Sequence, residues 1–223
     1  MSQREPVATL PSSRRPNRGS LASSGVRAVS VGLLGMTLGV ITAYGQGWLP
    51  HEVGSLANSV GSWAMVAFLL ALLGPTRRIA AMLGFLTLIT LLFGYVLGAS
   101  VRGDPSSTSL IAFWVLASLV AGPALGLSAY WVRTDRGHLA AVGVGVVSGV
   151  LLGEGVYGLT YIADTTYPPY WWSQIIVGVI LLGYVAARRL PQPGPRGVAI
   201  LCSVVVAAAF VGVYSQDLIS ILP

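Results

Sequence analysis

The chain has 223 residues, of which 54% are hydrophobic and 9% are charged, and its mean hydropathy is +0.76. About a quarter of the residues of a soluble domain are charged, because its surface must be hydrated. The composition therefore excludes a soluble globular protein and indicates an integral membrane protein. The net charge of +6 does not indicate a nucleic-acid-binding protein, because the basic residues are dispersed among the predicted loops.

The first 25 residues are rich in serine, proline and arginine and show no apolar periodicity. Such a segment buries too little apolar surface to offset the entropy lost on ordering. We therefore expect residues 1–25 to form a disordered basic arm in the cytoplasm, and residues 26–223 to form one membrane domain.

Seven apolar runs follow the arm, most of them close to the length that a helix needs to cross about 30 Å of hydrocarbon. They cover residues 26–44, 59–74, 79–100, 110–132, 139–162, 172–187 and 198–214. The second and the sixth are short. The sequence predicts an all-α, polytopic membrane helix bundle of seven transmembrane helices joined by brief loops.

The arginines indicate the orientation of this bundle. All thirteen basic residues are arginines, and if all seven helices span, twelve lie on one side of the membrane while Arg102 lies on the other. Cytoplasmic loops retain Lys and Arg. We therefore expect a multi-pass protein of the bacterial plasma membrane with its N-terminus inside and its C-terminus outside.

Many of the 28 glycines are spaced four residues apart within the predicted helices. Small residues at this spacing let helices approach closely in a bilayer. The examples are Gly35–Gly39, Gly94–Gly98, Gly122–Gly126 and the row Gly145, Gly149, Gly153. We interpret them as contacts within one chain, and a homo-oligomer or a membrane protein partner remains open.

Glu154 belongs to the stretch GEGVYGLTYIADTTYPPYWW, residues 153–172. It is expected within the membrane, on the order of 10 Å from the outer end of the fifth predicted helix. A charge facing lipid at that depth costs at least about 3 kcal/mol, so Glu154 should face the bundle interior. Tyr157 and Tyr161 follow at i+3 and i+7 and share its face.

A polar, aromatic vestibule open to the outside is predicted around Glu154. The stretch TAYGQGW, residues 42–48, offers Tyr44 and Gln46 as a second wall, which requires the first and fifth predicted helices to be neighbours. Trp172 is a third wall residue and Asp164 lies at the mouth. The pair Pro168–Pro169 is expected to keep the intervening loop out of helix.

A buried carboxylate has three solutions here. It can stay protonated and donate a hydrogen bond, or it can pair with Arg102; either makes the protein a structural or accessory membrane subunit. It can instead bind a small cationic ligand, with cation–π help from the aromatics, or take part in proton-linked transport. The last arrangement makes the chain a small-molecule binding or transport protein. The sequence leaves this function and that of a structural or accessory subunit both open.

The sequence does not favour an enzyme. Cys202 is the only cysteine, and His51 and His138 lie in different loops, so neither a disulfide nor a metal-ligand spacing is present. No hydrolase, zinc or nucleotide-binding motif occurs. We expect no catalytic residues, no metal and no cofactor.

Residues 153–172, together with TAYGQGWLPHEVGSLANSVGSWA at residues 42–64, carry a resemblance. The sequence resembles an uncharacterised family of small actinobacterial polytopic membrane proteins, a domain-of-unknown-function family, over residues 30–190. The resemblance implies membrane architecture, and it transfers no activity and no binding residue.

Overall fold

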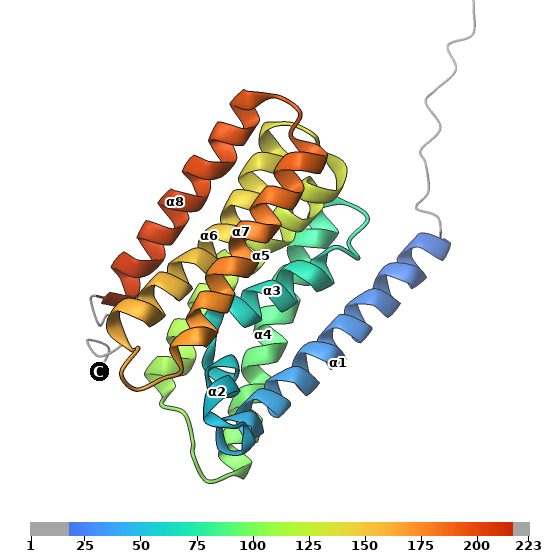
Figure 1. The fold of residues 1–223 in the computed structure, drawn as a ribbon. Helices are drawn as coiled ribbons and strands as arrows, with labels where there is room; N and C mark the ends of the chain where they lie inside the picture. Colours follow the sequence, from blue (N-terminus) through green and yellow to red (C-terminus); the bar gives the residue numbers. More distant parts are fainter. Residues whose placement is uncertain (1–17, 216–223) are drawn as a thin grey trace, which may run out of the picture.

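The computed structural model describes residues 18–215, and over this range it contains helices and no strand (Figure 1). The elements are α1 (Arg18–Trp48), α2 (His51–Gly54), the 3-10 helix η1 (Ser55–Asn58), α3 (Val60–Ala71), α4 (Arg77–Val101), α5 (Thr108–Thr134), α6 (His138–Tyr161), α7 (Pro168–Arg189) and α8 (Pro193–Ser215). Most of the arm predicted for residues 1–25 lies outside the described residues.

Six helices in this range are long and apolar enough to cross a membrane, namely α1 from Gly25 onward and α4 to α8. The second predicted span has a different form. The chain bends by 60° between His51–Asn58 and Val60–Ala71, and these two pieces make a seventh span only if they are counted together. With 12 residues, α3 is about 18 Å long, well short of the 30 Å or so of a hydrocarbon core.

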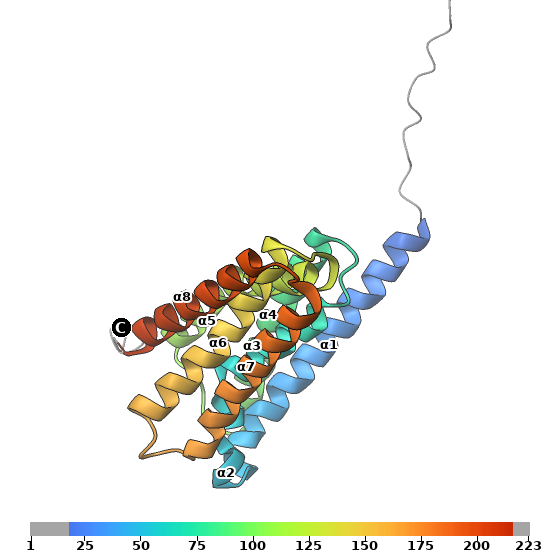
Figure 2. The ribbon, with the colours of Figure 1, turned by 45° about the horizontal axis from the view of Figure 1, so that its top comes forward.

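The long helices alternate in direction, which gives the bundle two distinct ends (Figures 1 and 2). At one end, here called the α2 end, α1, α4, α6 and α8 finish and α5 and α7 begin. The opposite, arginine-rich end carries Arg77, Arg133, Arg136, Arg188 and Arg196. α1 packs on α4 and α8 packs on α6, so these two helices form opposite edges, whereas α3 lies inside against α4, α5 and α6.

Glycines allow the closest of these helix contacts. A Cβ atom at Gly39 of α1 would collide with the Leu91 carbonyl of α4, and one at Gly94 of α4 would collide with the Met36 carbonyl of α1. On α6, a Cβ at Gly149 would lie 2.6 Å from Val206 Cβ of α8. The predicted glycine pairs therefore make helix contacts within one chain, because only a missing side chain lets the backbones approach this closely.

α7 corrects one prediction. It begins at Pro168, with both prolines in its first turn, and so starts four residues before the expected Trp172. Proline cannot continue a helix, but the first turn does not need its missing N–H, and its fixed φ suits that turn. The expectation that Pro168–Pro169 keeps the segment out of helix was therefore wrong.

Candidate functional site

The site is built on the break that precedes α3. Ser59 is buried with extended backbone angles (φ −82°, ψ 120°) and caps α3, its side chain accepting a hydrogen bond from Ser62 N. A helix leaves its first N–H groups without partners in the helix itself. In α3 these groups lie inside the bundle, so another part of the chain has to satisfy them.

Glu154 of α6 supplies the acceptors. Its Oε1 accepts from Val60 N at 2.6 Å, and its Oε2 accepts from Gly61 N at 2.8 Å and from Ser59 Oγ at 2.7 Å. The side chain is only 4% exposed. Gly61 makes this approach possible, since a Cβ there would lie 2.5 Å from Glu154 Oε2. As predicted, Glu154 faces the bundle interior.

The hydrogen bonds continue to α7. Gln174 Nε2 donates to Ser59 Oγ at 3.1 Å and to the Tyr170 hydroxyl at 2.6 Å, and that hydroxyl lies 3.1 Å from Ser62 Oγ. Because Ser59 Oγ accepts from Gln174 and Ser62 N, its single proton is directed to Glu154. Every partner of Glu154 is thus a donor, and the arrangement suits a carboxylate.

A second charged side chain holds the other end of α3. Arg133 of α5 donates to the carbonyl oxygens of Leu72 and Gly74, which follow the last residue of the helix. A helix carries about +0.5 elementary charge at its N-terminus and −0.5 at its C-terminus. Glu154 and Arg133 therefore complement both ends of a helix that is too short to place its ends in water at both membrane faces.

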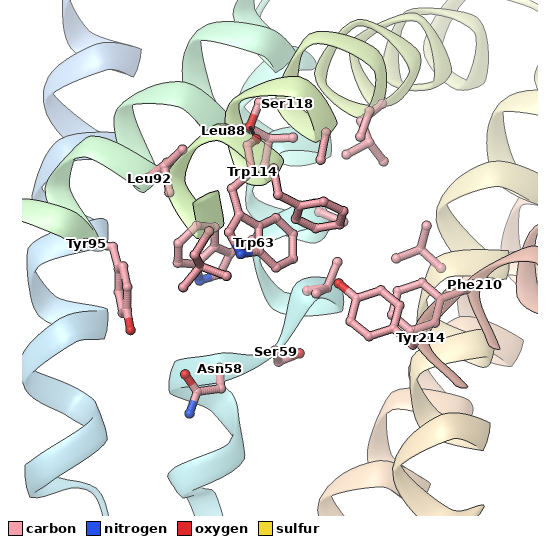
Figure 3. A pocket seen from close by; sticks show the side chains of 18 of the residues that line it. Asn58, Ser59, Trp63, Leu88, Leu92, Tyr95, Trp114, Ser118, Phe210 and Tyr214 are labelled. Atoms are coloured by element: carbon pink, nitrogen blue, oxygen red, sulfur yellow. Dashed lines mark hydrogen bonds between the residues drawn. The ribbon is translucent and has the colours of Figure 1, made fainter. Parts of the chain in front are cut away.

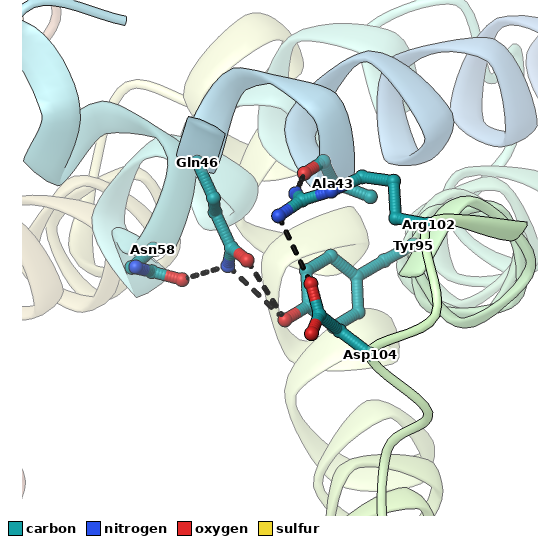
Figure 4. Close-up of polar contacts among 6 residues, drawn as sticks. All are labelled: Ala43, Gln46, Asn58, Tyr95, Arg102 and Asp104. Atoms are coloured by element: carbon teal, nitrogen blue, oxygen red, sulfur yellow. Dashed lines mark hydrogen bonds and ion pairs between the residues drawn. The ribbon is translucent and has the colours of Figure 1, made fainter. Parts of the chain in front are cut away.

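Arg102 does not pair with Glu154. It donates to the Ala43 carbonyl at the end of α1 and to Asp104 Oδ2 at 3.1 Å (Figure 4). The expected alternative of an ion pair between Arg102 and Glu154 is therefore not formed. Arg102 instead ties the ends of α1 and α4 together.

A cavity of about 570 Å³ lies at the α2 end next to Glu154. We call it the vestibule, and it is lined by Gln46, Leu49, His51, Gly54, Ser55, Asn58, Val60, Glu154, Tyr157, Ile162, Thr165, Thr166, Trp171, Phe210 and Tyr214. Three of the predicted site residues, Gln46, Glu154 and Tyr157, line it together. The break before α3 contributes the residues around Asn58.

The other predicted site residues lie elsewhere. Tyr44 packs against Trp48 with 5.1 Å between ring centroids and does not line the vestibule. Tyr161 is 54% exposed, stacks on Tyr157 and does not line the vestibule. Trp172 and Asp164 are both exposed, away from the lining.

Trp171 is the wall residue that sequence reasoning missed. It is buried, donates from Nε1 to Thr166 Oγ1 at 2.8 Å, and packs directly on Gly158 of α6. Consecutive helical residues are about 100° apart, since a turn holds 3.6 of them, so Trp171 faces inward while Trp172 faces outward. The glycines at 155 and 158 were the available signal, because they leave room for a large ring.

The expectation that the first and fifth predicted helices are neighbours was wrong. α1 packs on α4 and contacts η1, and it has no extensive interface with α6. Gln46 instead donates to Asn58 of η1 and, at 3.1 Å, to the Tyr95 hydroxyl of α4 (Figure 4). The inserted α2 and η1 lie between the two predicted walls, and both walls still border the same cavity.

Most of the chain matches one protein-family model. The model of a family of unknown function, DUF6518, matches residues 18–219. The chain belongs to this family. Comparisons of this DUF6518 chain with curated proteins and with solved structures gave no match.

The family match confirms the resemblance to a family of unknown function and extends it beyond residues 30–190. Across the described part of this DUF6518 protein, no group of three or more His, Cys, Asp or Glu side chains is placed to hold a metal ion. The six long apolar helices indicate a bilayer environment. The vestibule and the short helix α3 are therefore the two features of this protein that can indicate a function.

Proposed function

We propose that this DUF6518 protein is a membrane binding or transport protein for a small cation or amine, and that the vestibule is its ligand site. The observation that carries the proposal is the position of a carboxylate beside a polar cavity at a break in a helix. Transport proteins commonly form their sites at interrupted transmembrane helices, where backbone groups are free to contact a ligand.

Charge favours a cation over an anion in the vestibule. Glu154 contributes one negative charge, and the N-terminus of α3 offsets only about half of it. Among the described residues, no arginine lines the vestibule, and Arg102 is paired with Asp104. Oε1 of Glu154 has one donor, so it retains a lone pair for a further contact.

The aromatic lining supports the same ligand class. Tyr157 and Tyr214 pack edge to face with 5.5 Å between ring centroids, and both border the cavity. A cation over the face of an aromatic ring gains from 0.5 to 2 kcal/mol or so, most when it is desolvated. Gln46, Asn58 and Thr165 add neutral groups that can accept hydrogen bonds from an ammonium ion.

We further infer that the arginine-rich end lies in the cytoplasm of a bacterial cell and that the vestibule opens outward. Retention of arginine on the cytoplasmic side supports this orientation. The exclusive use of arginine as the basic residue suggests a GC-rich, actinobacterial source.

A structural or accessory membrane subunit is the alternative, and one observation favours it. Glu154 receives three donors from its own chain, which is sufficient to explain a buried carboxylate without any ligand. In this case the aromatic residues at the α2 end serve as an interfacial belt, and the partner is another membrane protein.

Thermal unfolding of the purified full chain discriminates between the two functions. Tetramethylammonium, ethanolamine, sodium and magnesium chlorides are each added over a concentration series. A ligand at a hundredfold excess over its Kd stabilises the folded state by about 2.7 kcal/mol. We expect an ammonium ion to raise the Tm of the wild type.

Tyr157→Leu should abolish that rise, because Tyr157 lines the vestibule. Tyr161→Leu is the matched control: its ring stacks on Tyr157 but lies outside the cavity. If neither ammonium ions nor metal cations change the Tm of the wild type, the ligand-binding proposal fails and the subunit alternative stands.

A further inference from the structure

A second cavity, of about 430 Å³, lies inside the bundle beside the vestibule. We call it the chamber. Five helices line it, with Trp63 from α3, Leu92 from α4, Trp114 and Ala117 from α5, and Phe210 from α8 among its walls. Figure 3 shows the two tryptophans at its centre, Tyr95 on the α4 side, and Phe210 with Tyr214 on the α8 side.

The chamber is long and runs parallel to the helices. On α5 its lining extends from Leu110 to Leu125, which is about 22 Å of helix. That distance is more than half of the roughly 30 Å of a hydrocarbon core. An elongated cavity with this direction fits an extended chain better than a compact molecule.

The chamber lies next to the lipid-facing surface of the bundle. α5 and α8 both pack on α6, but any contact between the two is slight. Val213 of α8 lines the chamber and is 44% exposed, so the chamber reaches the outer surface of the bundle there. A molecule dissolved in the bilayer can therefore reach the chamber between α5 and α8 without crossing water.

One polar group in the chamber lacks a partner. The indole Nε1 of Trp63 is buried and has no hydrogen-bond acceptor in the described part of the chain. Leaving a buried donor unpaired lowers stability, so such groups in native proteins call for an explanation. Nε1 exposes less than 1 Å² of surface, so a small rotation of the indole is needed to bring its N–H to an oxygen acceptor of a ligand in the chamber.

We propose that the chamber binds one hydrocarbon chain of a membrane lipid, with an oxygen acceptor near the head of that chain bonded to the Trp63 indole N–H. An ester carbonyl of a phospholipid and the head oxygens of a prenyl lipid share this chemistry. The apolar walls contact the chain, and the α2 end, where Asn58 and Tyr95 border the chamber, receives the polar head.

The chamber and the vestibule select for different chemistry. No arginine, lysine, aspartate or glutamate is among the chamber's lining residues, whereas Glu154 lines the vestibule. The stacked pair Phe210 and Tyr214, with 4.4 Å between ring centroids, borders both cavities and lies between them. The lipid proposal therefore does not depend on whether the vestibule binds a cation.

Native mass spectrometry of the delipidated full chain, titrated with phosphatidylglycerol and separately with a polyprenyl phosphate, tests the proposal. We expect one lipid to bind more tightly than the rest. Ala117→Phe places a ring in the chamber and should weaken that binding by about tenfold or more. Ala112→Phe is its control, because Ala112 is an exposed residue of the same helix outside the lining.

Trp63→Phe removes the N–H and keeps an aromatic ring, and it should weaken binding about fivefold. Trp131→Phe is the matched control, since the Trp131 indole N–H is also buried and unpartnered but lies outside the chamber. A tight site for polyprenyl phosphate alone identifies the chain as isoprenoid, and one for phosphatidylglycerol identifies it as acyl.

A photoreactive phosphatidylglycerol with a diazirine within one acyl chain tests the wild type without any substitution. Crosslinks should concentrate on the chamber face of α5, at Trp114, Ala117 and Ala121. Lipids of the surrounding bilayer would instead label the exposed Leu116 and Val120. Equal labelling of the two faces, or equal lipid binding by Ala117→Phe and Ala112→Phe, overturns the proposal.

Discussion

Replacement of Glu154 by glutamine is the most direct test of how α3 is held. The substitution keeps the size of the side chain and exchanges one carboxylate oxygen for an NH₂ group. The two oxygens of Glu154 face only donors, namely the N–H groups of Val60 and Gly61 and the Ser59 hydroxyl. In either orientation, the amide therefore points a donor at a donor.

The expected cost follows from these contacts. A hydrogen bond to a charged group contributes about 1.5–3 kcal/mol, and a buried N–H left without a partner costs about 1–3 kcal/mol. Loss of the charge at the N-terminus of α3 removes up to 2 kcal/mol or so more. Because these terms overlap, we expect Glu154→Gln to lower the free energy of unfolding by about 3 kcal/mol, which is roughly 6–12 °C in Tm for a chain of this size.

Thermal unfolding in one detergent at fixed pH, compared with Ser59→Ala, measures this cost. Loss of the Ser59 cap alone should cost about 1 kcal/mol. The two substitutions share a hydrogen bond, so the double variant should lose less than the sum of the single losses. An unfolding midpoint for Glu154→Gln equal to that of the wild type would refute the assignment of Glu154 as the partner of the α3 N-terminus.

Two further substitutions test the same helix. Gly61→Ala should destabilise the protein by about 1–3 kcal/mol, because the new Cβ would lie 2.5 Å from Glu154 Oε2; Gly54→Ala, with no atom within 4 Å of the new Cβ, should change the Tm little. Arg133→Gln should cost about 1–3 kcal/mol by weakening the hydrogen bonds to the carbonyls that follow α3. Arg136→Gln, at an exposed position, is its control, and equal Tm values for the two arginine variants would contradict the capping role.

Much of the membrane architecture was predictable because it depends on composition along the chain. Apolar runs predicted the six long helices of the described residues. The spacing of the glycines indicated contacts between helices of one chain. The inward orientation of Glu154 followed from the cost of exposing a charge to lipid. Each of these inferences starts from the residue pattern within a single helix.

The break at Ser59 was not predictable in the same way. An apolar run from 59 to 74 has the same composition whether its helix crosses the whole bilayer or half of it. A full-length helix and a half-length helix differ in whether other side chains form hydrogen bonds with the helix ends. Those side chains, Glu154 and Arg133, lie on α6 and α5. The chamber was also beyond sequence reasoning, because it depends on how little α5 and α8 contact each other.

The two charged partners of α3 also constrain the order in which the protein is assembled. The chain is synthesised from its N-terminus. The Val60 N–H bonds to Glu154, which follows it by 94 residues, and the Leu72 carbonyl bonds to Arg133, which follows it by 61 residues. Until α5 and α6 have been made, the Val60 N–H and the Leu72 carbonyl lack these two partners, and water is not available to replace them within the hydrocarbon layer. The segment from Val60 to Ala71 should therefore remain at the membrane surface or within the insertion machinery during synthesis, and should take its place in the bundle only after more than two thirds of the chain has been translated.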